Sequence, residues 1–261
     1  MIEPLECRIA PAVVLNLTVG RAGVLLVEDA ANPGDNIVNV SMDGSGTLHI
    51  DPADAATQIL FQGNLLALGG ALTVSGFSTF DVGELGGSIR GPVRVALGGA
   101  PASSFVMFTL GANANQADPL QVGAVTVTVA PTIESASLRL RNVIAQGPVK
   151  ITGARGFDLF AADDALFLAA ATVDLGPGDD LFRLEQETSA TSLTTPVGVT
   201  ASAPLTLLGG AGVDTFVVSG AGALQTVNAF ASIIIDGGAE TDLVTLGANG
   251  NYHAMLVQRN I

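Results

Sequence analysis

A glycine-rich turn followed by an apolar strand constrains this chain more than any other feature of its sequence. Residues 209–217 read GGAGVDTFV. Glycine accepts positive φ angles, so the first half of the stretch favours a tight turn, whereas residues 215–218 favour a short strand. Asp214 and Phe216 are two residues apart, and on an extended chain their side chains point to the same side. The stretch therefore predicts a turn that ends with a carboxylate beside a large apolar side chain.

The same nine-residue frame recurs along the chain in modified form. Residues 153–161, 175–183 and 237–245 fit it, and the aspartate positions of the four best copies are Asp158, Asp180, Asp214 and Asp242. Weaker copies put other residues in that position: Leu48, Ser78, Ser103 and Glu134. The spacing averages about 28 residues, which is typical of repeat architectures. Apolar runs precede most of the turns, at residues 93–97, 149–152, 172–175, 205–208 and 233–236. Strand, glycine turn and strand together form the repeating unit of a coil.

Residues 209–217 resemble one unit of the calcium-binding nonapeptide of the RTX family, which has paired glycines, a third glycine, an aspartate and a large apolar residue at fixed positions. This resemblance implies a β-solenoid with candidate Ca²⁺ ligands at Asp158, Asp180, Asp214 and Asp242. Carboxylates on neighbouring rungs, about 4.8 Å apart, would repel one another unless a cation such as Ca²⁺ lay between them. However, RTX units follow one another directly, whereas these copies are 22 to 34 residues apart. The alternative is that each aspartate accepts backbone N–H groups in its own turn.

We therefore predict an all-β fold, a right-handed parallel β-helix of about eight or nine rungs. The coil would form a single domain over residues 12–261, after an N-terminal segment at residues 1–11. A loop is expected to protrude near residues 186–202, which are rich in Thr and Ser. Tandem antiparallel β-sandwiches are the alternative, because they also contain many short strands. Strand pairing distinguishes the two, since a coil pairs residue i with a residue about 28 positions later.

The composition disfavours several classes of function. The net charge of −14 should repel nucleic acid. Sugar-binding grooves use aromatic faces, but the chain has one tyrosine and no tryptophan. No run of 18 apolar residues predicts a transmembrane segment.

Candidate catalytic residues are few. Asp163–Asp164 and Asp179–Asp180 are carboxylate doublets, but adjacent residues of a strand face opposite ways, so neither doublet forms an acid and base pair by itself. His49 and His253 have no companion that would indicate a metal site or a catalytic triad. We therefore expect a protein without enzymatic activity. A polysaccharide lyase or hydrolase is the least favoured reading.

The N-terminal segment carries a second resemblance. Leu5, Glu6, Arg8, Pro11 and Ala12 match the Leu-Glu-x-Arg-x-x-Pro-Ala stretch near the start of many planctomycete surface and exported proteins. The resemblance implies an extracellular or cell-surface location. It covers about ten residues, and the basic segment that normally precedes the stretch is missing here.

Both ends of the predicted coil are apolar, and an uncovered strand edge invites pairing with another chain. The edge residues would be Val13, Val14, Leu15 and Leu17 at one end and Met255, Leu256 and Val257 at the other. We expect the chain to associate with copies of itself, head to tail, into a fibre, layer or matrix. The alternative is that the two ends fold back as their own caps. A calcium-dependent adhesin or binding module is the second functional hypothesis.

Overall fold

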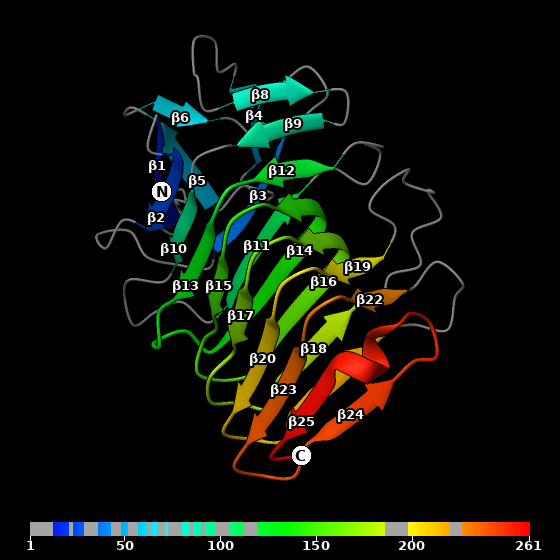
Figure 1. Ribbon diagram of the computed structural model, residues 1–261. Coiled ribbons are helices and arrows are strands. Elements are labelled where there is room, and N and C mark those ends of the chain that lie inside the picture. Colours follow the sequence, from blue (N-terminus) through cyan, green and yellow to red (C-terminus); the bar gives the residue numbers. More distant parts are fainter. Residues whose placement is uncertain are drawn as a thin grey trace, which may run out of the picture.

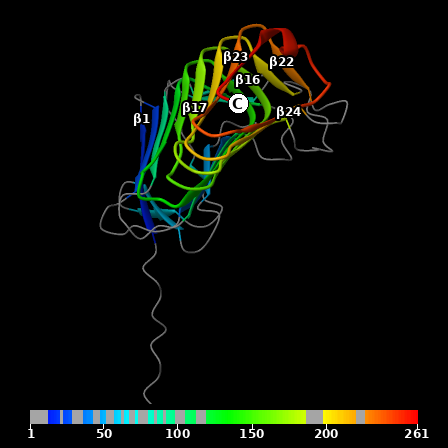
Figure 2. The ribbon, with the colours of Figure 1, turned by 90° about the horizontal axis from the view of Figure 1, so that it is seen from below.

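The computed structural model describes residues 58–60, 92–97, 105–111, 119–185, 198–219 and 226–261 in full, together with the backbone of the strands between residues 13 and 89. The described chain forms β-strands joined by turns and one short 3-10 helix, η1 (Tyr252–Met255). Most of the strands stack side by side along one axis, as Figures 1 and 2 show. The fold is therefore all-β with parallel sheets, as a β-solenoid requires.

Three ladders of parallel strands make up the coil. The first contains β10 (Val93–Leu97), β13 (Val125–Val129), β15 (Val149–Thr152), β17 (Ala171–Asp174), β20 (Leu205–Gly210), β23 (Ile233–Gly238) and β25 (Leu256–Arg259). The second contains β11 (Phe105–Gly111), β14 (Ser135–Ala145), β16 (Asp158–Phe167), β18 (Leu181–Leu184), β21 (Thr215–Val218) and β24 (Leu243–Leu246). The third contains β9 (Gly86–Ile89), β12 (Leu120–Val122), the ends of β14 and β16, β19 (Val199–Ala201) and β22 (Val227–Ala229).

The third ladder exists because two long strands turn a corner. In β14 and β16, Asn142 and Asp164 have φ angles of 50° and 48°, in the left-handed region that bends a strand. Residues beyond these positions pair with β12 and β19. In the later rungs, separate short strands take the place of the long ones.

The pairing register matches the spacing of the sequence repeat. Leu159 pairs with Leu181, Leu181 with Thr215, and Thr215 with Leu243, so the strands that follow Asp158, Asp180, Asp214 and Asp242 are in register. The apolar runs predicted before the turns correspond to β10, β15, β17, β20 and β23. From β10 onward every described ladder is parallel, so the antiparallel sandwich alternative is wrong for this part of the chain.

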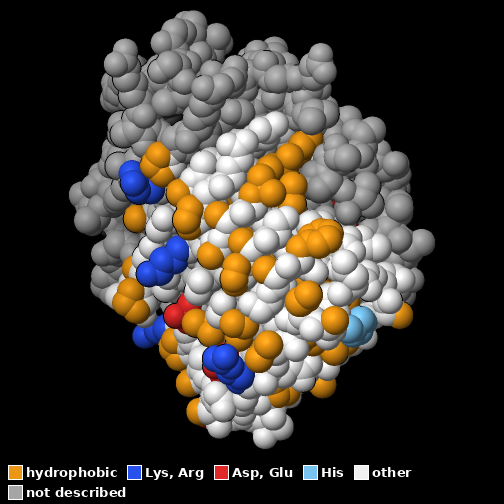
Figure 3. Space-filling view, viewed as in Figure 1, with side chains coloured by type: hydrophobic (Ala, Val, Ile, Leu, Met, Phe, Trp, Pro, Cys, Tyr) orange, Lys and Arg blue, Asp and Glu red, His pale blue; other side chains and the backbone are white. Residues whose placement is uncertain are grey.

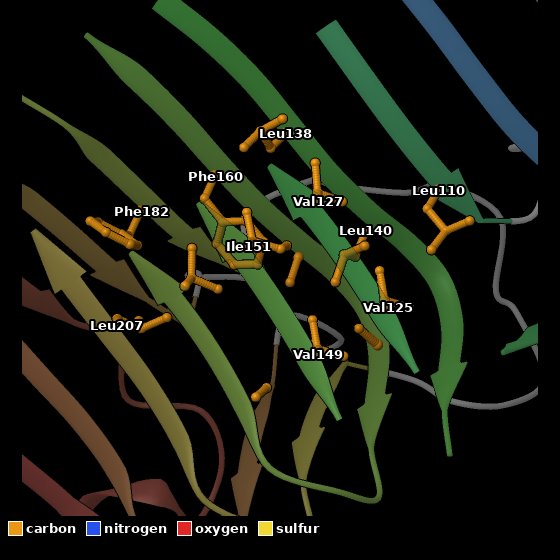
Figure 4. Close-up of a cluster of buried hydrophobic side chains, with 14 of the residues drawn as sticks. Leu110, Val125, Val127, Leu138, Leu140, Val149, Ile151, Phe160, Phe182 and Leu207 are labelled. Atoms are coloured by element: carbon orange, nitrogen blue, oxygen red, sulfur yellow. The ribbon is translucent and has the colours of Figure 1, made fainter. Parts of the chain in front are cut away.

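The interior is built from alternate residues of each strand. In β10 and β13 the inward valines and leucine are buried, while the residues between them face outward. Figure 4 shows Val125 and Val127 of β13 pointing into the same apolar interior as Leu140 of β14. Phe160, Phe182 and Phe216 occupy successive rungs of one inward column, and the rings of Phe182 and Phe216 stack with centroids 4.5 Å apart. One continuous apolar core therefore runs along the coil.

The N-terminal strands depart from this pattern. They are β1 (Val13–Gly20), β2 (Gly23–Glu28), β3 (Asn36–Met42), β4 (Leu48–Asp51), β5 (Thr57–Phe61), β6 (Asn64–Leu66), β7 (Ala71–Leu72) and β8 (Phe80–Gly83). Strands β2 and β3 extend the ladders in parallel beside β10 and β11, but β1–β2, β3–β4, β5–β6 and β8–β9 are antiparallel pairs. Leu48, predicted to belong to a parallel rung, instead pairs antiparallel with Met42, so that prediction is wrong.

Two predicted segments fall partly or wholly outside the described residues. The N-terminal segment 1–11 lies outside them, as do residues 186–197 of the predicted loop and the frame positions Ser78 and Ser103. The end of that loop is different from the expectation, because residues 199–201 form β19 and pair with β16 and β22. They belong to the coil.

Candidate functional site: an aspartate ladder

Four aspartates form a column at the corner between the first and second ladders. We call Asp158, Asp180, Asp214 and Asp242 the aspartate ladder. Each is buried, with exposed fractions of 0%, 1%, 0% and 7%. Asp214 and Phe216 are both completely buried, which confirms that their side chains share one side of the strand. The repeat thus places a carboxylate inside the coil at each of four successive turns.

Hydrogen bonds join each aspartate to the preceding rung. Oδ1 of Asp180, Asp214 and Asp242 accepts the backbone N–H of the aspartate one rung earlier, at 2.8, 2.8 and 2.7 Å. Asp158 accepts the backbone N–H groups of Ala136 and Ala154, both at 2.5 Å. Each carboxylate therefore satisfies a backbone donor at the point where the chain turns and the regular strand ladder is interrupted.

The first member of the ladder corrects the sequence alignment of the repeat. Glu134 was predicted to occupy the aspartate position one rung before Asp158. The register pairs Ala136 with Asp158, two residues further on, and the Glu134 side chain forms an ion pair with Arg155 at the surface. Ala136 contributes only its backbone N–H to the ladder.

The second carboxylate oxygen has a different environment. Oδ2 of Asp158 accepts the Ala154 N–H, but Oδ2 of Asp180, Asp214 and Asp242 is buried without a hydrogen-bond partner. The first glycine of the frame lies directly against this oxygen. A Cβ added to Gly209 would overlap Asp214 Oδ2 and lie 2.8 Å from the Gly237 carbonyl oxygen. Close approach to the carboxylate explains why the frame begins with glycine, and Gly210, with φ of +105°, supplies the turn.

Burial dominates the electrostatics of the ladder. Desolvation raises the pKa of Asp158 to about 7, of Asp180 to about 8 and of Asp214 to about 6, against a normal value of 3.8. Backbone N–H donors lower the pKa of each group but do not offset burial. Neighbouring acidic side chains raise the pKa of Asp180 and Asp214 further.

This geometry does not gather the aspartates around one cation. Within the described residues, no three carboxylate, imidazole or thiol groups lie together as a metal-binding cluster. One oxygen of each aspartate is engaged by a backbone N–H, which matches the alternative of backbone-bonding aspartates. For Asp180, Asp214 and Asp242, however, that donor belongs to the neighbouring rung rather than to the residue's own turn.

A second set of acidic groups lies at the corner between the second and third ladders. Glu185 Oε2 accepts the Asp164 N–H at 2.9 Å, and Asp164 Oδ1 accepts the Gly198 N–H at 3.0 Å. Glu185 has φ of 58° and is buried. It lies outside the nine-residue frame, so the frame does not predict it. Acidic side chains thus bond to turn backbones at two corners of the coil.

The two carboxylate doublets serve separate backbone contacts. Asp179 Oδ1 accepts the N–H of Val213 at 2.8 Å, while Asp180 belongs to the ladder. Asp164 likewise bonds at its corner, whereas Asp163 lies opposite Arg141 on the strand. His253 stacks on Tyr252 near the C-terminal end, and the side chain of His49 is outside the described residues.

The two predicted assembly edges have different outcomes. Strand β1, which contains Val13, Val14, Leu15 and Leu17, is paired with both β2 and β5, so the prediction of an edge there is wrong. The two sheets end instead at β6 and β7. The physical reason is that β5 pairs with β1, and β6 pairs in turn with β5.

At the other end, β24 and β25 are edge strands. Leu246 is in register with the fully buried Val218, yet it is 38% exposed, since no described rung follows β24 to cover it. Met255 and Val257 are exposed by 42% and 40%, while Leu256 is partly buried against the core. Helix η1 covers part of this end: Tyr252 is completely buried, and its hydroxyl donates to the Gly247 carbonyl oxygen at 2.6 Å.

The outer face of the first ladder carries no concentrated charge. Figure 3 shows apolar side chains spread over this view of the molecule, with a few basic and acidic groups among them. In the described residues, no helix is long and apolar enough to cross a membrane. Comparison of the whole chain with protein-family models, curated proteins and solved structures finds no match.

Proposed function

We propose that this chain is a non-enzymatic structural protein of the cell exterior that associates with copies of itself into a fibre, layer or matrix. The observation that carries the proposal is the incompletely covered C-terminal end of the coil. Among the strands that the structure describes, none lies beyond the edge strands β24 and β25, and core-facing Leu246 is exposed by 38%. Backbone donors and acceptors along such an edge are satisfied by another strand.

The proposed contact is head to tail. Because β1 is paired on both sides, we propose that the receiving edge is formed by β6 and β7, where the two sheets end. Contacts between unlike ends do not close on themselves and so generate open filaments. We propose a right-handed coil of about eight or nine rungs for each subunit.

The exterior location is supported by the sequence. The N-terminal residues resemble planctomycete surface and exported proteins, and the repeat resembles RTX solenoids. The net charge of −14 disfavours nucleic acid as a partner and suits a surface in contact with salt.

The calcium-dependent adhesin has less support. Its candidate ligands are the aspartate ladder, whose Oδ1 atoms already accept backbone N–H groups. A lyase or hydrolase is weaker still, because the carboxylate doublets contact turn backbones.

Association is tested by light scattering after size-exclusion chromatography and by negative-stain microscopy over a range of concentrations. We expect the wild-type chain to form filaments or higher oligomers. Leu246→Lys should shift it towards monomer, since a charge would be buried at the joint. Leu168→Lys is the matched control, because Leu168 is 47% exposed and follows β16, an interior strand that is paired with β14 and β18 on its two sides. A wild-type chain that stays monomeric at high concentration across salt conditions would contradict the proposal.

A further inference from the structure

We propose that the aspartate ladder stores protons inside the folded coil: Asp180 and Asp214 are neutral carboxylic acids, protonated on Oδ2, and the coil loses stability when they ionise. The inference is independent of the proposed function.

The hydrogen bonding of the ladder carries this inference. Oδ1 of Asp180 accepts the Asp158 N–H, and Oδ1 of Asp214 accepts the Asp180 N–H, which either protonation state allows. Oδ2 of each residue is buried and receives no donor. An ionised carboxylate in this position would leave charge on a buried oxygen without a hydrogen bond, which costs far more than burying the neutral acid.

A protonated Oδ2 becomes a donor, and for Asp214 an acceptor lies nearby. The position that a Cβ of Gly209 would take is crowded both by Asp214 Oδ2 and by the Gly237 carbonyl oxygen of the next rung. The same is true at Gly237, where Asp242 Oδ2 and the Asn260 carbonyl oxygen converge. Oδ2 of Asp214 and Oδ2 of Asp242 thus each meet the same point beside the backbone as the carbonyl oxygen of the following rung.

The charged groups facing Asp180 and Asp214 are acidic. Asp158 comes from β16, Asp179 from the turn before β18, and Glu240 and Asp242 from the turn before β24. The basic residue in the turn before β16, Arg155, pairs with Glu134. Ionising one ladder residue therefore adds charge to a site already surrounded by negative charge.

The sign of the pH dependence follows from linkage. Burial raises the pKa of Asp180 to about 8 and of Asp214 to about 6, whereas the unfolded value is 3.8. Between the unfolded and folded values, the folded chain binds more protons than the unfolded chain, so stability falls as pH rises. The contribution is complete below the unfolded pKa and is lost as pH rises through the folded values.

The test is thermal unfolding of the full chain from about pH 4 to pH 9, with a chelator present. We expect the melting temperature of the wild type to fall as pH rises across the folded pKa values. Asp214→Asn replaces the acid with a neutral amide, which keeps an acceptor oxygen and has an NH2 group as donor. It should melt above the wild type at the alkaline end and close to it at the acidic end. Asp174→Asn on β17 makes the same charge change outside the ladder and should leave the slope unaltered.

Carbon-13 NMR of the side-chain carboxyl groups gives a direct reading on the wild type, which keeps the test decisive if the variant does not fold. We expect the Asp180 and Asp214 signals to titrate well above the normal aspartate pKa. Titration at or below the normal value would overturn the proposal. So would a variant that melts below the wild type at alkaline pH only. A calcium-induced rise in melting temperature that Asp214→Asn abolishes would assign the ladder to a cation instead.

Discussion

At the residue scale, the repeat is explained by the contact between a glycine and a carboxylate. Gly209 and Gly237 lie against Oδ2 of Asp214 and Asp242, so the first position of the frame and its aspartate depend on each other. The copy at residues 175–183 departs from this rule, because its first residue is Leu175, where the other strong copies have glycine. Leu175 is completely buried. Asp180, the aspartate of the same copy, has the highest pKa of the three ladder residues whose pKa is raised.

Gly209→Ala should destabilise the coil by about 1–3 kcal/mol, because the new methyl group overpacks the corner. The measurement is urea unfolding followed by circular dichroism. In an Asp214→Ala background the same substitution should cost less, since one of the two groups it meets is gone. Equal costs in both backgrounds would show that the glycine does not depend on the carboxylate.

At the scale of the element, the stacked aromatic column connects the rungs of the second ladder. Phe182 and Phe216 are completely buried, and their rings are nearly parallel, with an interplanar angle of 13°. Each strand of this ladder contributes only a few inward side chains, so a large part of its packing rests on one ring.

Phe182→Ala should lower the free energy of unfolding by about 3–5 kcal/mol, because it opens a cavity in the core. Phe230→Ala is the control: its ring is 68% exposed, so we expect a change within about 0.5 kcal/mol. Denaturant unfolding of the wild type, Phe182→Ala and Phe230→Ala measures the three free energies of unfolding. A small loss for Phe182→Ala would mean that the neighbouring rungs collapse to fill the space.

At the scale of the whole molecule, the two ends of the coil are built differently. The C-terminal end finishes in edge strands β24 and β25, whereas antiparallel hairpins cover the N-terminal end. The two ends of the coil are therefore different surfaces, and the proposed head-to-tail contact joins one kind of end to the other.

This difference changes what proline does at each end. Val14 lies within β1, which pairs on both sides, so Val14→Pro should remove a ladder hydrogen bond and destabilise the N-terminal layer by about 1–3 kcal/mol. Leu256→Pro lies on an edge strand and should mainly reduce association. Hydrogen exchange of the backbone amides separates the two effects. Unchanged protection of β1, β2 and β5 in Val14→Pro would contradict the pairing.

The sequence predicted the parallel part of the coil because its information there is local. Glycine turns, alternating apolar residues and the frame spacing located β10, β15, β20, β21 and β23, and the distances between Asp158, Asp180, Asp214 and Asp242 equal the pairing register. A turn motif repeated once per rung has to align when the strands stack. Weak copies were less reliable: the frame put Glu134 two residues away from the true position, Ala136.

By itself, the sequence determined an all-β chain whose repeated aspartates share a side with the core. Only the tertiary structure decided what those carboxylates bond to, because their donors lie on the neighbouring rung, 22 to 34 residues away. It also decided which strands are edges, since β1 looks like a free terminal strand until β5 pairs with it. Both depend on contacts between distant segments, whose formation is governed by chain closure and burial rather than by local preference.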